Sequence, residues 1–230
     1  MIRLPRWLSR RATLPPALQQ RLDAWRSLPA PPAQTPFESS RCVVMDTETS
    51  GLQPATERLL SIGAVHLDRL RIDLGSGFEA VLRQTHPSAP GNIVIHGIGA
   101  DEQRAGEVPP LALLRFLEFA GHAPLIAFHA RFDAAFMQRA MREHLGIDPG
   151  LRWLDLAAIL PPLFEARRDL ALDGWLQRFD IEAPVRHSAL GDALAVAQLA
   201  QIALRKAASR GLIHFAALQK LSSDARWLPR

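Results

Sequence analysis

The stretch that decides the fold runs from Cys42 to Gly51 and reads CVVMDTETSG. Its four leading apolar or small residues, two of them β-branched, are typical of a buried strand. Side chains on a strand alternate between its faces, so Asp46 and Glu48 should project to the same side where the strand ends. Neighbouring carboxylates repel each other unless a cation lies between them, and their hard oxygens suit Mg²⁺ or Mn²⁺. Because a surface or structural Asp-x-Glu pair has the same letters, the metal hypothesis depends on acidic residues further along the chain.

The length and composition indicate one globular domain with an extension. The chain has 230 residues, of which 48% are hydrophobic and 22% are charged. It contains no apolar stretch long enough to span a bilayer, and its first residues lack the apolar segment of a secretory signal. The single cysteine, Cys42, excludes an internal disulfide. We therefore expect a cytoplasmic protein that does not enter a membrane.

The positive charge is concentrated at the start of the chain. The formal net charge is +4, from 27 basic and 23 acidic residues. Residues 1–40 contain six arginines against Asp23 and Glu38, so the remainder of the chain holds equal numbers of basic and acidic residues. The remainder is therefore not a generic basic nucleic-acid binder. If its acidic residues hold divalent cations, the site itself becomes positive.

Residues 1–40 are rich in arginine and proline, and we predict that they form an N-terminal extension. A helix is expected at about 17–28, after two prolines, and a proline-rich linker follows it. Leu18, Leu22 and Trp25 fall on one face of this helix. The helix could pack on the body of the protein or belong to a mobile tail. Because arginines interleave with Trp7 and Trp25, the segment could also dock a protein partner or nucleic acid, and an Arg-rich transit peptide is a third reading.

The remainder of the chain alternates between strand and helix signals. We predict strands at 42–45, 58–67 and 78–82 with a turn at 73–77, a helix at 109–121, a strand at 125–128, a helix at 131–145, a strand at 153–156, a helix that ends at Pro161-Pro162, and helices at 170–179 and 189–208. Three strands followed by strands alternating with helices indicate an α/β domain with a mixed sheet. We place this domain at 41–210, with a short tail at 211–230 that has room for a final helix.

Two further acidic residues lie at predicted helix starts. Asp133 begins the helix that follows a strand, where an anion is favoured by the helix dipole. Ser188 is a suitable N-cap for the last long helix, which places Asp192 in its first turn and His187 just outside it. Each of these features alone has an ordinary structural explanation.

The order of these motifs is specific. Asp46-x-Glu48, then Phe132-Asp133, then His187 five residues before Asp192 resembles the DEDDh branch of the 3′–5′ exonucleases, which includes the epsilon proofreading subunit of bacterial DNA polymerase III. The resemblance covers about residues 41–205. It extends to the stretches RLLSIGAV at 58–65, HGI at 96–98 and LDGWL at 172–176.

The resemblance implies an RNase H-like fold, with a five-stranded mixed sheet and one antiparallel strand. It also implies that two divalent cations, Mg²⁺ or Mn²⁺, are held by Asp46, Glu48, Asp133 and Asp192, with His187 as the general base. The expected reaction is two-metal hydrolysis of single-stranded DNA from its 3′ end, which releases nucleoside 5′-monophosphates. DNA is expected over RNA because of the likeness to the epsilon subunit. The alternatives are an exonuclease of short RNA and a non-catalytic adaptor that binds a partner through residues 1–40.

The resemblance also implies residues that contact the substrate. Leu52 resembles the family's apolar wedge beside the terminal base, and Thr49 would line the same pocket. Thr47 and His129 are the other candidates. The chain departs from the family at two places: Phe128-His129 stands where the family has His-Asn, and Ser61 stands where many members have Glu.

Overall fold

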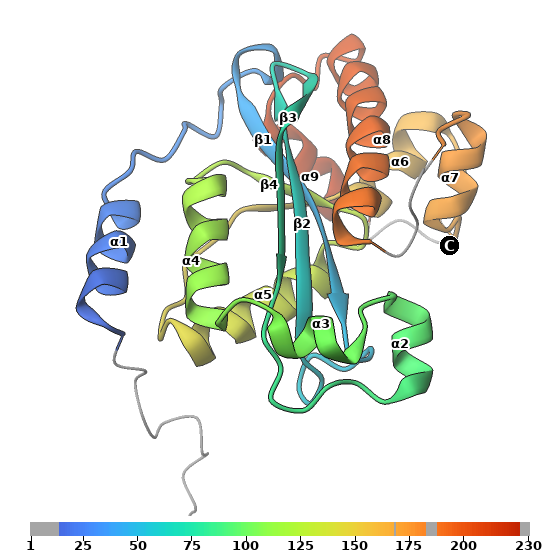
Figure 1. Cartoon of the computed structure of the whole chain (residues 1–230). Helices are drawn as coiled ribbons and strands as arrows, with labels where there is room; N and C mark the ends of the chain where they lie inside the picture. Colours follow the sequence, from blue (N-terminus) through green and yellow to red (C-terminus); the bar gives the residue numbers. More distant parts are fainter. Residues whose placement is uncertain (1–13, 168, 183–187, 226–230) are drawn as a thin grey trace, which may run out of the picture.

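A central sheet of five strands organises the computed structural model, which describes residues 14–167, 169–182 and 188–225 (Figure 1). The strands are β1 (Arg41–Thr49), β2 (Leu59–Asp68), β3 (Arg71–Val81), β4 (Leu125–Ala127) and β5 (Trp153–Asp155), in the order β3-β2-β1-β4-β5. β2 is antiparallel to both β1 and β3, whereas β1, β4 and β5 are parallel. The predicted mixed sheet with one antiparallel strand is therefore confirmed.

Helices cover both faces of this sheet (Figure 1). The described helices are α1 (Pro16–Arg26), the short 3-10 helix η2 (Phe37–Ser39), α2 (Pro90–His96), α3 (Ala100–Ala105), α4 (Pro109–Ala120), α5 (Arg131–His144), α6 (Leu156–Phe164), α7 (Leu172–Arg178), α8 (Ala189–Ser209) and α9 (Phe215–Ala225). Within the described ranges, none combines the length and the apolar character needed to cross a membrane.

β1 alternates between two hydrophobic cores. Val44 belongs to the core formed with α6, α7 and α8, while Val43 and Met45 belong to the core formed with α4 and α5. The side chains of a strand point to alternate faces. The same alternation therefore directs Asp46 and Glu48 toward the α8 side of the sheet and Thr47 toward the α5 side.

The third strand is longer than the sequence predicts. β3 begins at Arg71, and the predicted turn at 73–77 lies inside it. The true turn is Arg69-Leu70, where both residues have positive φ (49° and 59°), as a two-residue hairpin turn requires. β3 is an edge strand with an irregular register opposite Ala64 and His66, and such positions tolerate the Gly and Ser that otherwise signal a turn.

The prediction that a helix ends at Pro161-Pro162 is also wrong, because α6 continues to Phe164. Each proline removes one backbone donor, but the helix spans only nine residues and buries Ile159, Leu160 and Leu163 against the core. Packing of an apolar face outweighs intrinsic propensity in a short helix. The last turn closes on Glu165, which adopts the left-handed conformation.

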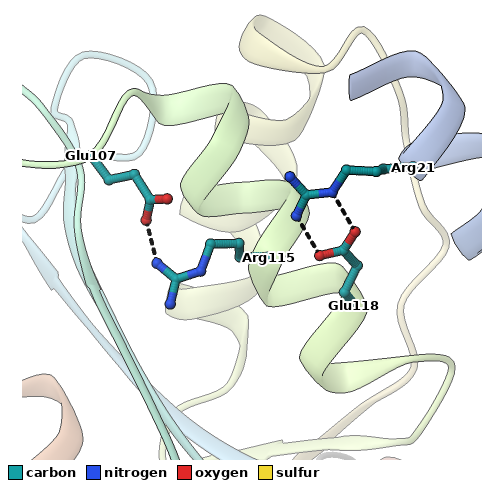
Figure 2. A network of polar contacts seen from close by, with 4 residues as sticks. All are labelled: Arg21, Glu107, Arg115 and Glu118. Atoms are coloured by element: carbon teal, nitrogen blue, oxygen red, sulfur yellow. Dashed lines mark hydrogen bonds and ion pairs between the residues drawn. The ribbon is translucent and has the colours of Figure 1, made fainter. Parts of the chain in front are cut away.

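Helix α1 packs against α4 in the body of the protein. Leu22 and Trp25 are 1% and 4% exposed, and the Trp25 indole Nε1 donates to the Gly121 carbonyl at 3.0 Å. The Arg21 guanidinium forms two hydrogen bonds with the Glu118 carboxylate, at 2.8 and 2.6 Å (Figure 2). Among the alternatives considered for residues 1–40, the helix packed on the body of the protein is the one that α1 adopts. The domain boundaries stay predictions, and the first thirteen residues, with Trp7, lie outside the described residues.

Candidate active site

Three of the four predicted metal ligands meet at the end of β1. Asp46 and Glu48 come from β1 and Asp192 comes from the first turn of α8. Each offers a carboxylate oxygen, and these oxygens all lie within 4.8 Å of one another. Asp46 and Glu48 are partly exposed, whereas Asp192 is buried. Three hard oxygen donors at this spacing fit a divalent cation, which would offset their mutual repulsion.

A glycine allows α8 to approach β1 this closely. Gly63 of β2 is the direct cross-strand partner of Asp46. A Cβ atom at Gly63 would lie 2.0 Å from the Ala189 carbonyl carbon and 2.1 Å from the Leu190 nitrogen. Only a residue without a side chain therefore lets the start of α8 rest on β2, one turn before Asp192. Sequence reasoning missed this role, although a glycine inside an apolar strand is the expected signal of close backbone approach.

The start of α8 confirms the predicted N-cap. The Ser188 Oγ accepts from the Gly191 amide at 3.4 Å, and the Asp192 amide donates to the Ser188 carbonyl at 2.8 Å. The Ser188 hydroxyl also lies 3.4 Å from Glu79 Oε1 on β3, where Glu79 is the cross-strand partner of Gly63. These contacts fix the backbone that carries Asp192. The predicted general base, His187, lies outside the described residues.

Asp133 lies on the other side of β1. It occupies the first turn of α5, is 3% exposed, and accepts a hydrogen bond from the Thr47 Oγ1 at 2.8 Å. Burial raises the pKa of Asp133 to about 7, against the opposing effect of the Thr47 hydrogen bond, and the charge of Asp155 raises it further. Asp133 is not one of the three residues whose oxygens converge.

The predicted substrate contacts have different surroundings. Leu52 is 84% exposed just after the turn that follows β1, so its side chain is available to a ligand. The Thr49 hydroxyl donates to the Gly51 carbonyl at 2.8 Å and stabilises that turn. His129 is exposed and has a positive φ of 60°, whereas Thr47 is 7% exposed and bonded to Asp133. The exposed Leu52 and His129 therefore have the free surface that a substrate contact needs.

Helix α2 is tied to the same turn. The Asn92 side-chain amide donates to the Ser50 carbonyl at 2.7 Å, so α2 lies near the end of β1 (Figure 1). Sequence reasoning did not single out Asn92. It lies in a helix whose flanking prolines and glycines gave no periodic signal, and its partner is a backbone carbonyl 42 residues away.

The fold and the acidic cluster define the class of protein as an RNase H-like α/β domain with a candidate metal site. The sequence profile of the exonuclease family (RNase_T) matches residues 43–200, and the chain therefore belongs to this family. The predicted DEDDh resemblance and the predicted enzyme class are confirmed at the level of the family.

Two curated relatives support this assignment. The chain is 33% identical over 192 residues to a DNA polymerase III subunit epsilon-like protein of Rhodobacter capsulatus, a match that covers 81% of this chain and 27% of that protein. It is 31% identical over 181 residues to the PolC-type DNA polymerase III of Bacillus subtilis, which covers 76% of this chain and 12% of that protein. The chain thus spans about a quarter or less of the length of these relatives.

Solved structures share the fold. Exonuclease I of E. coli in complex with a dT13 oligonucleotide aligns with a TM-score of 0.64 at 20% identity, covering 75% of this chain and 42% of that one. The nuclease domain of 3′hExo, a DEDDh family member bound to rAMP, aligns with a TM-score of 0.63 at 15% identity, covering 72% and 92%. These likenesses confirm the predicted RNase H-like fold.

Proposed function

We propose that this domain is a 3′–5′ exonuclease that acts on single-stranded DNA ends and releases nucleoside 5′-monophosphates. The observation that carries the proposal is the convergence of Asp46, Glu48 and Asp192 from two elements far apart in the sequence. Carboxylates repel one another at this spacing, so a protein that assembles them gains from a bound cation. Membership of an exonuclease family makes a phosphodiester the corresponding substrate.

Asp46, Glu48 and Asp192 would hold the cations, and Asp133 would join them from the α5 side. We expect two Mg²⁺ or Mn²⁺ ions, as in the family that the motifs resemble. Bound divalent cations supply positive charge that stabilises the attacking and leaving oxygens of a phosphodiester. The chain's own task is to hold its carboxylates in place, which β1 achieves by strand alternation and α8 by its close contact with Gly63.

His187 would act as the general base. It directly precedes Ser188, the N-cap of the helix whose first turn carries Asp192. An imidazole has a pKa near neutrality, so it can accept the proton of the attacking water at physiological pH. Leu52 would contact the terminal base, with Thr49 holding the turn beside it. Thr47 and His129 complete the candidate contacts to the terminal nucleotide.

DNA is the favoured substrate because the relatives with the highest identity given above are named for DNA polymerase III. Single strands are favoured because the oligonucleotide in the Exonuclease I complex is dT13. An exonuclease of short RNA is the alternative, supported by the fold shared with 3′hExo, which was solved with rAMP. A protein partner bound through residues 1–40 and a cytoplasmic location remain part of the proposal.

The test uses matched oligonucleotides labelled at the 5′ end: single-stranded DNA, double-stranded DNA and RNA of one sequence. With Mg²⁺ or Mn²⁺ present, we expect single-stranded DNA to shorten stepwise from its 3′ end and release 5′-monophosphates. Chelation of the metal by EDTA should stop the reaction. If RNA is degraded faster than single-stranded DNA, the protein is an exonuclease of short RNA, the alternative function. If none of the three substrates shortens with either metal, the proposal is wrong.

A further inference from the structure

A cavity lies on the α4 and α5 side of the sheet, the face opposite to the acidic cluster. Its volume is about 480 Å³, within the range of small-ligand sites. Three arginines from three different segments line it: Arg58 before β2, Arg83 after β3, and Arg139 on α5. Convergence of guanidinium groups from separate segments is typical of sites that bind phosphate or carboxylate.

Two of the three guanidinium groups are held in place by the protein. Arg139 donates through Nη1 to the carbonyls of Pro54 and Glu57, at 2.6 and 3.1 Å, and pairs through Nε with Glu143 at 2.7 Å. Arg83 donates through Nε to the Gly106 carbonyl at 2.9 Å. Such fixed groups lose little conformational entropy when they bind a ligand.

Arg58 is different, because its Nε is buried and has no hydrogen-bond partner. A buried donor without a partner is rare in native proteins and calls for an explanation. Among the described residues, neither Arg58 nor Arg83 forms an ion pair, whereas the cavity's Glu143 is paired with Arg139. The cavity's other acid, Glu57, accepts the Ser50 hydroxyl at 2.5 Å. An anionic ligand in the cavity would balance the charge of Arg58 and Arg83.

We propose that this cavity binds a phosphate group carried by a nucleotide, either within the nucleic-acid strand or as the free monophosphate. The cavity and the acidic cluster share one loop: the Ser50 amide, just after β1, donates to the Arg58 carbonyl at 2.9 Å. If a strand whose 3′ end lies at Asp46 runs over this loop, one of its upstream phosphates would meet the cavity. The strand version of this inference rests on the proposed function.

The test measures binding without hydrolysis. Anisotropy of a fluorescent twelve-nucleotide single-stranded DNA is followed in EDTA for wild type, Arg58→Gln and Arg83→Gln, with thermal melts to establish the folded fraction. The control is Arg142→Gln, because Arg142 lies on α5 but outside the cavity and pairs with Asp148. We expect each cavity variant to bind on the order of tenfold more weakly, the effect of losing one charged hydrogen bond. The salt slope should fall by about 0.7 for each lost phosphate contact, and the control should match wild type.

Competition separates the two sources of phosphate. If deoxynucleoside monophosphate binds wild type more tightly than Arg58→Gln while the oligonucleotide affinity is equal, the ligand is the free nucleotide. If only the oligonucleotide affinity falls, the ligand is a strand phosphate. If both cavity variants bind both ligands as the control does, the inference is overturned. This assay measures binding in EDTA, without hydrolysis. If the wild type fails to degrade any oligonucleotide in the nuclease assay, the proposed function is wrong, but the binding result for the cavity is unaffected.

Discussion

Two helices bring an acidic residue to β1 from opposite sides, and the two residues have different surroundings. α8 brings Asp192 to the face of Asp46 and Glu48, where the carboxylate oxygens lie within 4.8 Å of one another. α5 brings Asp133 to the other face, where it is 3% exposed and accepts a hydrogen bond from Thr47. The two helices cover opposite faces of the sheet (Figure 1).

The difference shows that four acids of one sequence motif do not share one environment. On the α8 side, three neighbouring carboxylates repel one another and favour a cation. On the α5 side, burial raises the pKa of Asp133 to about 7, and the Thr47 hydroxyl provides a donor. The α8 side therefore brings together three carboxylates that fit a divalent cation, whereas Asp133 is a buried, hydrogen-bonded acid with a raised pKa.

The largest effect is expected from Asp46→Ala, on the α8 side. This change removes one carboxylate of the converging three and leaves any bound cation with fewer ligands. We expect kcat with Mg²⁺ to fall at least 10³-fold, about 4 kcal/mol of activation free energy. The metal-free variant should remain folded, because it relieves carboxylate repulsion. A kcat within tenfold of wild type, at equal folded fraction, would remove Asp46 from the site.

Two glycines that face α8 allow a sharper test of how that side is assembled. A Cβ at Gly63 would lie 2.0 Å from the Ala189 backbone, whereas a Cβ at Gly77 would lie 3.6 Å from the Leu190 side chain, an ordinary contact. Gly63→Ala should displace the start of α8 and lower kcat about 100-fold, the usual cost of a 1 Å misplacement. Gly77→Ala should change it little.

Metal affinity distinguishes a displaced Asp192 from a general loss of protein stability in Gly63→Ala. Calorimetric titration with Mn²⁺ should show weaker binding for Gly63→Ala than for Gly77→Ala when both are folded. Equal affinities would mean that α8 adjusts without moving Asp192, and that Gly63 serves packing alone.

The placement of Asp46, Glu48 and Asp192 could be predicted from the sequence because the sequence signals for it are local. Alternation along residues 42–48 places Asp46 and Glu48 on one face, and Ser188 marks the start of the helix that carries Asp192. Each signal needs only a few neighbouring residues. The resemblance then joins these distant segments, which no local pattern can do.

The features that the sequence did not predict depend on contacts between segments that are distant in the chain. Gly63 matters because the backbone of residue 189 rests on it, and the Asp133 environment depends on a threonine 86 residues away. The length of β3 follows from its place at the sheet edge, and α6 passes two prolines because its leucines are buried. The apolar residues of α6 do recur at helical spacing, but the contacts of Gly63, of Asp133 and of the β3 edge leave no periodic trace in the sequence.

A smaller effect is expected from Asp133→Asn, measured as thermal stability in EDTA. The folded-state pKa of Asp133, about 7, lies above the ordinary value of 3.8. The folded protein therefore binds this proton more tightly, and stability is lost as pH rises from about 4 through 7. Asparagine carries no charge and can still accept from Thr47. Asp133→Asn should raise the melting temperature by several degrees at pH 8, and little at pH 5.

The same variant tests the predicted metal role. If Asp133 joins the cations, Asp133→Asn should lose activity with Mg²⁺ even where its metal-free form is more stable. The melting temperatures of Asp133→Asn and wild type are compared at each pH. If their difference is the same at pH 8 as at pH 5, burial does not raise the pKa of Asp133.

The smallest effect is expected from Thr47→Val, which removes the hydroxyl that donates to Asp133 while keeping the branched shape. Loss of one hydrogen bond to a buried acid should cost about 1–3 kcal/mol, more at pH 8 than at pH 5, because the ionised carboxylate depends more on its donor. Thr47 is 7% exposed, so this role predicts lower stability with an unchanged KM for single-stranded DNA. The alternative, a direct substrate contact, predicts the opposite: KM should rise while the melting temperature stays constant. Melting curves at the two pH values, with KM at matched folded fraction, distinguish a residue that supports the α5 side from one that contacts the nucleotide.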